Sequence, residues 1–157
     1  MGYRIVISII GQAIIKCTTI SIRKTGGLIM KLNKIHHIAI ICSNYERSKK
    51  FYVNILGLDI IKEVYRKDRE SYKLDLGVSG NYQIELFSFK QSPKRPSYPE
   101  ARGLRHLAFE VDNIDEGIKE LNDKNVLTED IRIDEITGKR FTFFSDPDDL
   151  PIELYEK

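Results

Sequence analysis

Apolar residues after residue 30 are spaced in a way that predicts one strand, one helix and then three more strands. Residues 35–42 have the apolar alternation of a strand. Ser43 and Asn44 then supply helix-capping side chains, and apolar residues at helical spacing continue up to Gly57, which is expected to end the helix. The strands that follow are predicted over residues 58–65, 71–76 and 81–89.

The same order of elements is predicted a second time. Asn113 is the expected cap of a second helix, with Glu116 at capping-box distance, and Asn125 is its expected end. Strands are predicted over residues 104–111, 128–133, 140–144 and 150–155. Between the copies, residues 91–102 contain three prolines and cannot continue a sheet. We therefore expect a single domain over residues 30–157, made of modules 31–90 and 103–157 that the connector 91–102 joins.

Each module carries one histidine and one glutamate at nearly the same separation. His37 precedes Glu85 by 48 residues, and His106 precedes Glu153 by 47. Strand alternation places each of these side chains on the face opposite its apolar neighbours. If the sheets curve, the four side chains can converge, and two imidazoles with two carboxylates predict a metal site.

Each of these residues alone also has a structural explanation. A single histidine on a strand is more often structural than a metal ligand, and a lone glutamate between apolar neighbours usually faces solvent. The paired occurrence at equivalent positions of a repeat favours the metal interpretation. His36 lies on the opposite pleat and has Arg105 as its repeat equivalent, so we assign it a structural role.

Composition and charge exclude several classes of partner. The chain of 157 residues has a formal net charge of +2, but four basic residues and no acid fall within residues 1–30, so the remainder is slightly acidic. This balance predicts neither a nucleic-acid partner nor a membrane partner. Two cysteines make no disulfide framework and fit a reducing cytosol, so we expect a cytoplasmic protein.

Residues 1–29 differ from the rest of the chain. Their apolar run over residues 5–15 is too short to span a bilayer, and it lacks a clean secretory cleavage pattern. Gly26 and Gly27 shortly precede Met30, and glycine codons can form a bacterial ribosome-binding sequence. We therefore interpret Met30 as the natural start and residues 1–29 as a non-native or disordered leader.

These motifs together resemble the vicinal oxygen chelate superfamily, which includes glyoxalase I (lactoylglutathione lyase). The resemblance covers residues 31–157. It is carried by the His-Ile-Ala-Ile strand from His37, residues 48–57 on the first helix, residues 103–109, and Asp146-Pro147-Asp148 leading into Ile152-Glu153-Leu154. The implied fold is α+β: two βαβββ modules that form a curved, mostly antiparallel sheet cup around a metal.

The resemblance also implies a chemistry and a ligand set. The implied ligands are His37, Glu85, His106 and Glu153, which suit Ni²⁺, Zn²⁺, Co²⁺ or Mn²⁺. In the glyoxalase I reaction, a metal-chelated hemithioacetal of a 2-oxoaldehyde is isomerised through an ene-diolate while a carboxylate moves the proton. We assign that role to Glu153, with Glu85 as the alternative. A homodimer is the implied assembly.

Two departures from glyoxalase I leave the substrate open. Ile41 and Phe89 stand where those enzymes resemble one another in an Arg and an Asn. We therefore expect another thiol adduct or a different anion as substrate. The candidate residues for holding an anion are Arg95, Arg102, Lys139 and Arg140, although any one of them alone is more often a solvated surface charge. Phe141 and Phe143 are candidate pocket walls, with packing in the core as the alternative. Alternative functions are an Fe²⁺ dioxygenase, an acyl-CoA epimerase with Gln at the position of Glu85, a thiol transferase, and a non-enzymatic small-molecule-binding module.

Overall fold

A computed structural model describes residues 30–157 of the chain. The predicted leader, residues 1–29, lies outside the described residues. Residues 34–157 form one compact unit. Within residues 30–157, no helix has the length and apolar character needed to cross a membrane.

The first module forms a four-stranded mixed sheet, as predicted. Its strands are β1 (Ile38–Cys42), β2 (Asp59–Arg66), β3 (Ser71–Val78) and β4 (Asn81–Ser88), in the order β1-β4-β3-β2. β1 runs parallel to β4, and the other two pairs are antiparallel. β1 begins later than the strand predicted from residue 35, because its pairing with β4 begins with Ile38 opposite Ile84. His37 therefore lies just before the strand.

The helix of the first module begins where the capping residues predict. The side chain of Asn44 accepts a hydrogen bond from the backbone N–H of Arg47 at 3.0 Å, which satisfies one of the free donors in the first turn. Helix α1 (Tyr45–Lys50) continues as one π-helical segment (Phe51–Ile55). Gly57 follows with a φ of +74°, the left-handed conformation that favours glycine after a helix.

The second module repeats this architecture with one shortened strand. Its elements are β5 (Leu107–Val111), α2 (Ile114–Asp123), β6 (Arg132–Ile133), β7 (Arg140–Ser145) and β8 (Pro151–Glu156), and the sheet order is β5-β8-β7-β6. The side chain of Asn113 caps α2 through the N–H groups of Asp115 and Glu116. The strand predicted over residues 128–133 is reduced to two residues, because only Arg132 and Ile133 pair with β7.

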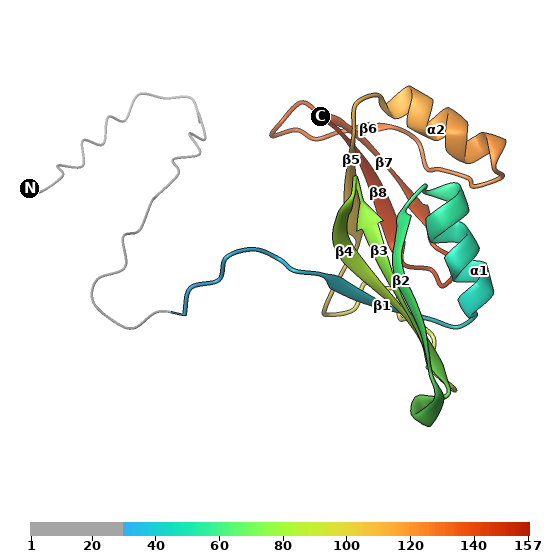
Figure 1. Cartoon of the computed structure of the whole chain (residues 1–157). Helices are drawn as coiled ribbons and strands as arrows, with labels where there is room; N and C mark the ends of the chain where they lie inside the picture. The colour runs from blue at the N-terminus through green and yellow to red at the C-terminus, as the bar shows by residue number, and fades with distance from the viewer. Residues whose placement is uncertain (1–29) are drawn as a thin grey trace, which may run out of the picture. The chain divides into compact units, whose positions relative to one another are not determined.

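The two modules are joined through the side of the sheets that carries the helices. Figure 1 shows α1 and α2 on the same side of the strands, and the buried apolar residues of both modules form one continuous cluster beneath them. Across this contact Tyr52 donates a hydrogen bond to Asp146 at 2.8 Å, and the ring of Phe51 lies against that of Phe144. The opposite sheet faces, which carry the predicted ligands, are left open, and Ile41 on that side is 53% exposed.

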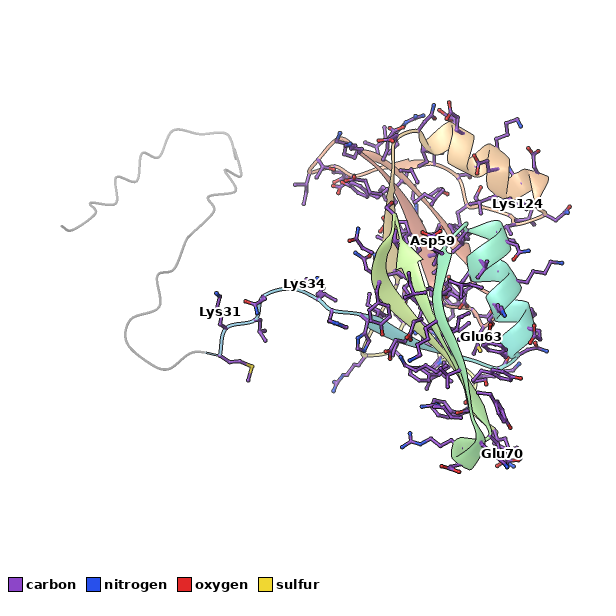
Figure 2. All side chains as sticks on the ribbon, viewed as in Figure 1. Lys31, Lys34, Asp59, Glu63, Glu70 and Lys124 are labelled. Atoms are coloured by element: carbon purple, nitrogen blue, oxygen red, sulfur yellow. The ribbon has the colours of Figure 1, made fainter. Side chains whose placement is uncertain are left out.

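Hydrogen bonds at the edge of the core also hold the helices against neighbouring elements. Glu63 of β2 accepts hydrogen bonds from Tyr45 and Lys49 of α1, each at 2.6 Å, and Figure 2 shows Glu63 beside that helix. Lys124, which follows α2, donates to the carbonyl of Ile55 at 2.7 Å. These bonds fix the helices against the strands and against each other.

The Tyr52 and Asp146 contact leads to a stability prediction. Burial raises the pKa of the Asp146 carboxyl, and its oxygens accept hydrogen bonds from Tyr52 and from the backbone N–H groups of Asp148 and Leu150. Tyr52→Phe should lower the free energy of unfolding by about 1.5–3 kcal/mol, because a buried carboxyl loses a donor. Urea denaturation measures this change. The matched variant Tyr98→Phe, at a residue 74% exposed, should leave stability unchanged, and an equal loss in both variants would contradict the assignment.

Candidate metal centre

The first module brings His37 and Glu85 together. Parallel pairing of β1 with β4 places Ala39 opposite Glu85, so that the histidine two residues earlier lies on the same face. The His37 Nε2 is 3.5 Å from the Glu85 Oε2. The alternation of the two strands therefore places an imidazole beside a carboxylate, two groups that could ligate a metal, on the open side of the sheet.

The second module builds the same pair again. Ala108 of β5 lies opposite Glu153 of β8, and the His106 Nε2 is 3.0 Å from the Glu153 Oε2. Glu153 is only 9% exposed. In both modules, then, the same imidazole nitrogen faces the same carboxylate oxygen.

The two pairs do not meet within one chain. Across residues 30–157, no group of three or more histidine, cysteine, aspartate or glutamate side chains is close enough to hold one metal ion. A four-ligand site made by one copy alone is therefore not formed. The physical reason is the contact between the modules, which uses the helix-covered side and leaves the two ligand faces apart.

Glu85 is held by a polar network that the sequence analysis missed. Lys73 lies 2.6 Å from the Glu85 Oε1 and also contacts Asp75, while Tyr82 donates a hydrogen bond to the same Oε1. Partial burial alone would raise the pKa of Glu85, but the hydrogen bonds from Lys73 and Tyr82 hold it below its ordinary value. Because Oε1 is occupied, Oε2 is the oxygen that faces His37.

Glu153 has apolar surroundings instead. Phe143 lies opposite it in the strand pairing, at the position that Asp75 takes opposite Glu85. The His106 ring meets the Phe143 ring edge to face at 5.2 Å. Within residues 30–157, the contact with His106 is the one polar side-chain interaction of Glu153. Glu153 is therefore less restrained than Glu85.

The residue that precedes each of the two histidines contacts the Nδ1 of its ring, the nitrogen that does not face the glutamate. The His36 Nδ1 is 2.8 Å from the His37 Nδ1, so His36 touches the candidate site as well as preceding it. A histidine that binds a metal through Nε2 donates its other N–H to an outer partner, and His36 can accept that hydrogen bond. At the equivalent place the Arg105 Nη1 is 3.2 Å from the His106 Nδ1. Since arginine is only a donor, this contact requires the tautomer with a bare Nδ1.

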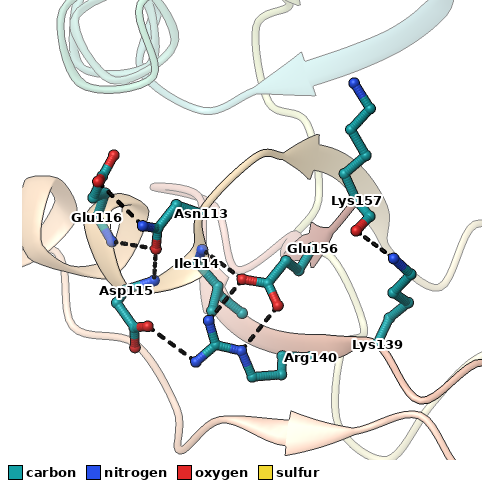
Figure 3. Close-up of polar contacts among 8 residues, drawn as sticks. All are labelled: Asn113, Ile114, Asp115, Glu116, Lys139, Arg140, Glu156 and Lys157. Atoms are coloured by element: carbon teal, nitrogen blue, oxygen red, sulfur yellow. Dashed lines mark hydrogen bonds and ion pairs between the residues drawn. The ribbon is translucent and has the colours of Figure 1, made fainter.

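Two of the four basic residues considered for an anionic substrate are already engaged. Arg140 donates hydrogen bonds to Glu156 at 2.7 and 2.9 Å and to Asp115 at 3.0 Å (Figure 3). Lys139 donates to the backbone oxygen of Lys157. These contacts link β7 to the end of β8 and to the start of α2. Arg140 and Lys139 therefore already have partners within the fold.

The Arg140 contact predicts a pH dependence of stability. Hydrogen bonds from Arg140 lower the pKa of Glu156 to about 2. A lowered carboxyl pKa stabilises the folded chain above the unfolded pKa near 4.5, and that contribution is lost as the pH falls toward 2. Urea denaturation from pH 6 to 3 should show that the difference in stability between wild type and Glu156→Gln shrinks with falling pH. A difference independent of pH would contradict this.

Comparison with known proteins identifies the family. Residues 34–154 match the model of the Glyoxalase/Bleomycin resistance protein/Dioxygenase superfamily. The chain is 61% identical over 128 residues to the uncharacterized protein YwkD of Bacillus subtilis, covering 82% of this chain and all of YwkD. A glyoxalase family protein from Enterococcus faecalis has a structure that superposes with a TM-score of 0.74 at 50% identity, covering 81% of this chain and all of that one.

More distant relatives include enzymes. Human mitochondrial methylmalonyl-CoA epimerase is 28% identical over 119 residues, which cover 68% of this chain and 64% of the epimerase. Metallothiol transferase FosB of Staphylococcus saprophyticus also matches, and a FosX protein of Listeria monocytogenes with the same fold was solved with Mn(II). The two sheets, the repeated modules and these matches agree, and the chain belongs to the glyoxalase/bleomycin resistance/dioxygenase superfamily.

Proposed function

We propose that this chain is a metal-dependent lyase of the glyoxalase I type, which isomerises a small substrate bound through two neighbouring oxygens. The observation that carries the proposal is the repeated pair: each module places a histidine Nε2 against a glutamate Oε2 on an open sheet face. Repetition of this arrangement is unexpected if the four side chains had unrelated structural roles.

The donor set fits a divalent first-row metal ion. Two imidazole nitrogens with two carboxylate oxygens suit Ni²⁺, Zn²⁺, Co²⁺ or Mn²⁺. The Glu85 Oε2 is available to a metal ion, because Lys73 and Tyr82 bind the Glu85 Oε1 and leave Oε2 beside His37. When bound, such an ion supplies Lewis acidity that polarises the substrate oxygens and makes the adjacent carbon more acidic.

A second copy of the chain completes the site. One copy supplies His37 and Glu85, and its partner supplies His106 and Glu153, because a single copy does not bring the four together. The ligand faces are free for this contact, since the modules join through their helix-covered side. The proposed functional unit is therefore a homodimer with two equivalent sites.

The two glutamates have different proposed roles. Glu85 is the fixed ligand, because Lys73 and Tyr82 restrain its carboxylate. Glu153 is the base that takes a proton from one substrate carbon and returns it to the neighbouring carbon, since its carboxylate is less restrained and lies against Phe143. This assignment follows the polar and apolar surroundings that distinguish the two modules.

An acyl-CoA epimerase is the second candidate function. It needs the same removal and return of a carbon-bound proton, and an epimerase is among the relatives of the chain. The carboxylate of Glu85, where epimerases resemble one another in Gln, favours the lyase.

The test combines metal analysis with a substrate screen in deuterated water. The purified chain is reconstituted with each of the four metals and incubated with methylglyoxal and a series of low-molecular-weight thiols, or with acyl-CoA thioesters. Mass spectrometry then follows deuterium at the reacting carbon. The proposal predicts a thiol-dependent product from methylglyoxal. Turnover of acyl-CoA alone supports the epimerase, and a chain that binds no metal and turns over neither class is a binding module.

A further inference from the structure

We propose that the cavity beside His106 binds an oxyanion group of the substrate, a carboxylate, phosphate or phosphonate, through three arginines. The assignment of this anion to the substrate rests on the proposed function, whereas anion binding itself does not. The cavity is partly open and is lined by residues from the connector, from the segments that lead into β5 and β6, from β6 and β7, and from the start of β8. Its lining includes Arg95, Ser97, Glu100, Arg105, Glu129, Arg132, Phe143 and Pro151.

Phe143 connects the cavity to the candidate metal centre. Its ring forms part of the cavity wall and also meets the His106 ring edge to face. Phe143 lies opposite Glu153 in the strand pairing. A substrate held beside Glu153 can therefore extend over this ring into the cavity.

The size of the cavity indicates what part of a ligand it accepts. Its volume is about 200 Å³, below the range of about 300–1,000 Å³ that is typical for whole drug-sized ligands. The cavity therefore fits one small group of a substrate and leaves the rest outside. This size is consistent with a terminal anionic group.

The charged lining favours an anion. Three arginines face two glutamates, Glu100 and Glu129, which leaves one excess positive charge. Arg132 contacts Glu129 at 2.7 Å and Arg105 contacts Glu100 at 3.7 Å, but more than half of each glutamate side chain is exposed. Exposed ion pairs contribute little to stability, so an incoming oxyanion can replace them at low cost.

Arg95 is the anchored member of the cluster. It donates to the carbonyl oxygens of Leu104 and Arg105 and to the Ser97 hydroxyl. Within residues 30–157 it makes no ion pair, so its charge has no carboxylate partner there. Hydrogen bonds to neutral acceptors thus hold a guanidinium beside the cavity with its charge uncompensated.

The other two guanidinium groups are positioned by stacking. Arg132 lies over the rings of Phe141 and Phe143 at 5.1 and 5.0 Å, and Arg105 lies over Phe143 at 5.9 Å. Stacking orients an arginine without using its N–H donors, so the donors that now contact the exposed Glu129 and Glu100 can turn to an oxyanion when it replaces those glutamates. Arg105 also contacts the His106 Nδ1, a contact that metal binding through Nε2 would release.

Calorimetric titration of the full-length, metal-stripped chain tests the proposal, with inorganic phosphate, methylphosphonate and acetate as separate probes. Phosphate and methylphosphonate binding without acetate binding identifies a tetrahedral oxyanion, and the reverse identifies a carboxylate. Arg132→Gln and Arg105→Gln should each weaken binding about tenfold or more, because each loses charge-assisted hydrogen bonds. Circular dichroism confirms that the variants are folded.

Arg69→Gln is the matched control, because Arg69 is an exposed residue between β2 and β3 and lies outside the cavity lining. It should bind the probes as the wild type does. Failure of every probe to bind wild type, or equal weakening in all three variants, overturns the proposal. Metal content measured on the same variants separates the two claims: anion binding without metal binding contradicts the proposed function alone.

Discussion

Replacing His106 with alanine is expected to abolish tight binding of a divalent metal ion. The variant removes one of two imidazoles and leaves Glu153 with Phe143 as its neighbour in the strand pairing. The loss should exceed the roughly 10–100-fold effect of removing an outer partner of a ligand. Inductively coupled plasma mass spectrometry after dialysis against each metal measures the occupancy. His37→Ala should have the same effect.

The third histidine supplies the graded control. The chain has three histidines, and His36 contacts the Nδ1 side of the His37 ring and the edge of the Tyr82 ring. His36→Ala should therefore weaken metal binding within the range of about 10–100-fold expected for an outer partner. Wild-type metal binding by His106→Ala, or an equal loss in His36→Ala and His106→Ala, would contradict the assignment of ligands.

Replacing Glu153 with glutamine is expected to lower kcat by about 10²–10⁴-fold, the usual contribution of a positioned acid or base. Glutamine keeps the shape of the side chain and removes its capacity to accept a proton. Glu85→Gln should instead act first on metal occupancy, because Lys73 and Tyr82 fix Glu85 beside His37. Steady-state kinetics at measured metal content distinguishes the two effects.

Glu110→Gln is the matched control for this experiment. Glu110 is an exposed residue of β5, and strand alternation places it on the face that carries Ala108 and His106. It should have wild-type kcat. An unchanged kcat in Glu153→Gln, or an equal loss in Glu110→Gln, would show that Glu153 is not the proton carrier.

Much of this arrangement could be predicted from local patterns. Strand alternation predicts which face each histidine and glutamate takes, and the pairing of Ala39 with Glu85 and of Ala108 with Glu153 confirms both positions. The helix caps at Asn44 and Asn113 also form as expected. These features depend on residues near one another in sequence or on a repeat, so the pattern of a single chain contains them.

The separation of the two pairs could not be predicted in this way. It depends on which side of each sheet the modules use for their mutual contact, and that contact involves Tyr52 and Asp146, which are 94 residues apart. Nothing in the alternation of β1 or β5 distinguishes a cup within one chain from a cup between two. Knowing which sheet face each side chain takes therefore does not determine whether one chain or two chains form the metal site.

The asymmetry between the glutamates had a signal that was overlooked. Lys73 and Asp75 alternate with buried leucines on β3, which places both on the face of Glu85. The equivalent residues in the second module are phenylalanines. By contrast, the engagement of Arg140 by Glu156 and Asp115 depends on side-chain geometry that the sequence pattern does not determine.

Metal binding by a mixed dimer tests the central claim most directly. One variant lacks His37 and Glu85, and the other lacks His106 and Glu153, each replaced by alanine. Neither binds metal alone if the site is shared, but a dimer of the two, isolated through different affinity tags, regains one intact site from the unaltered pair of each copy. The account predicts one metal ion per mixed dimer. A mixed dimer that forms and binds no metal would contradict it.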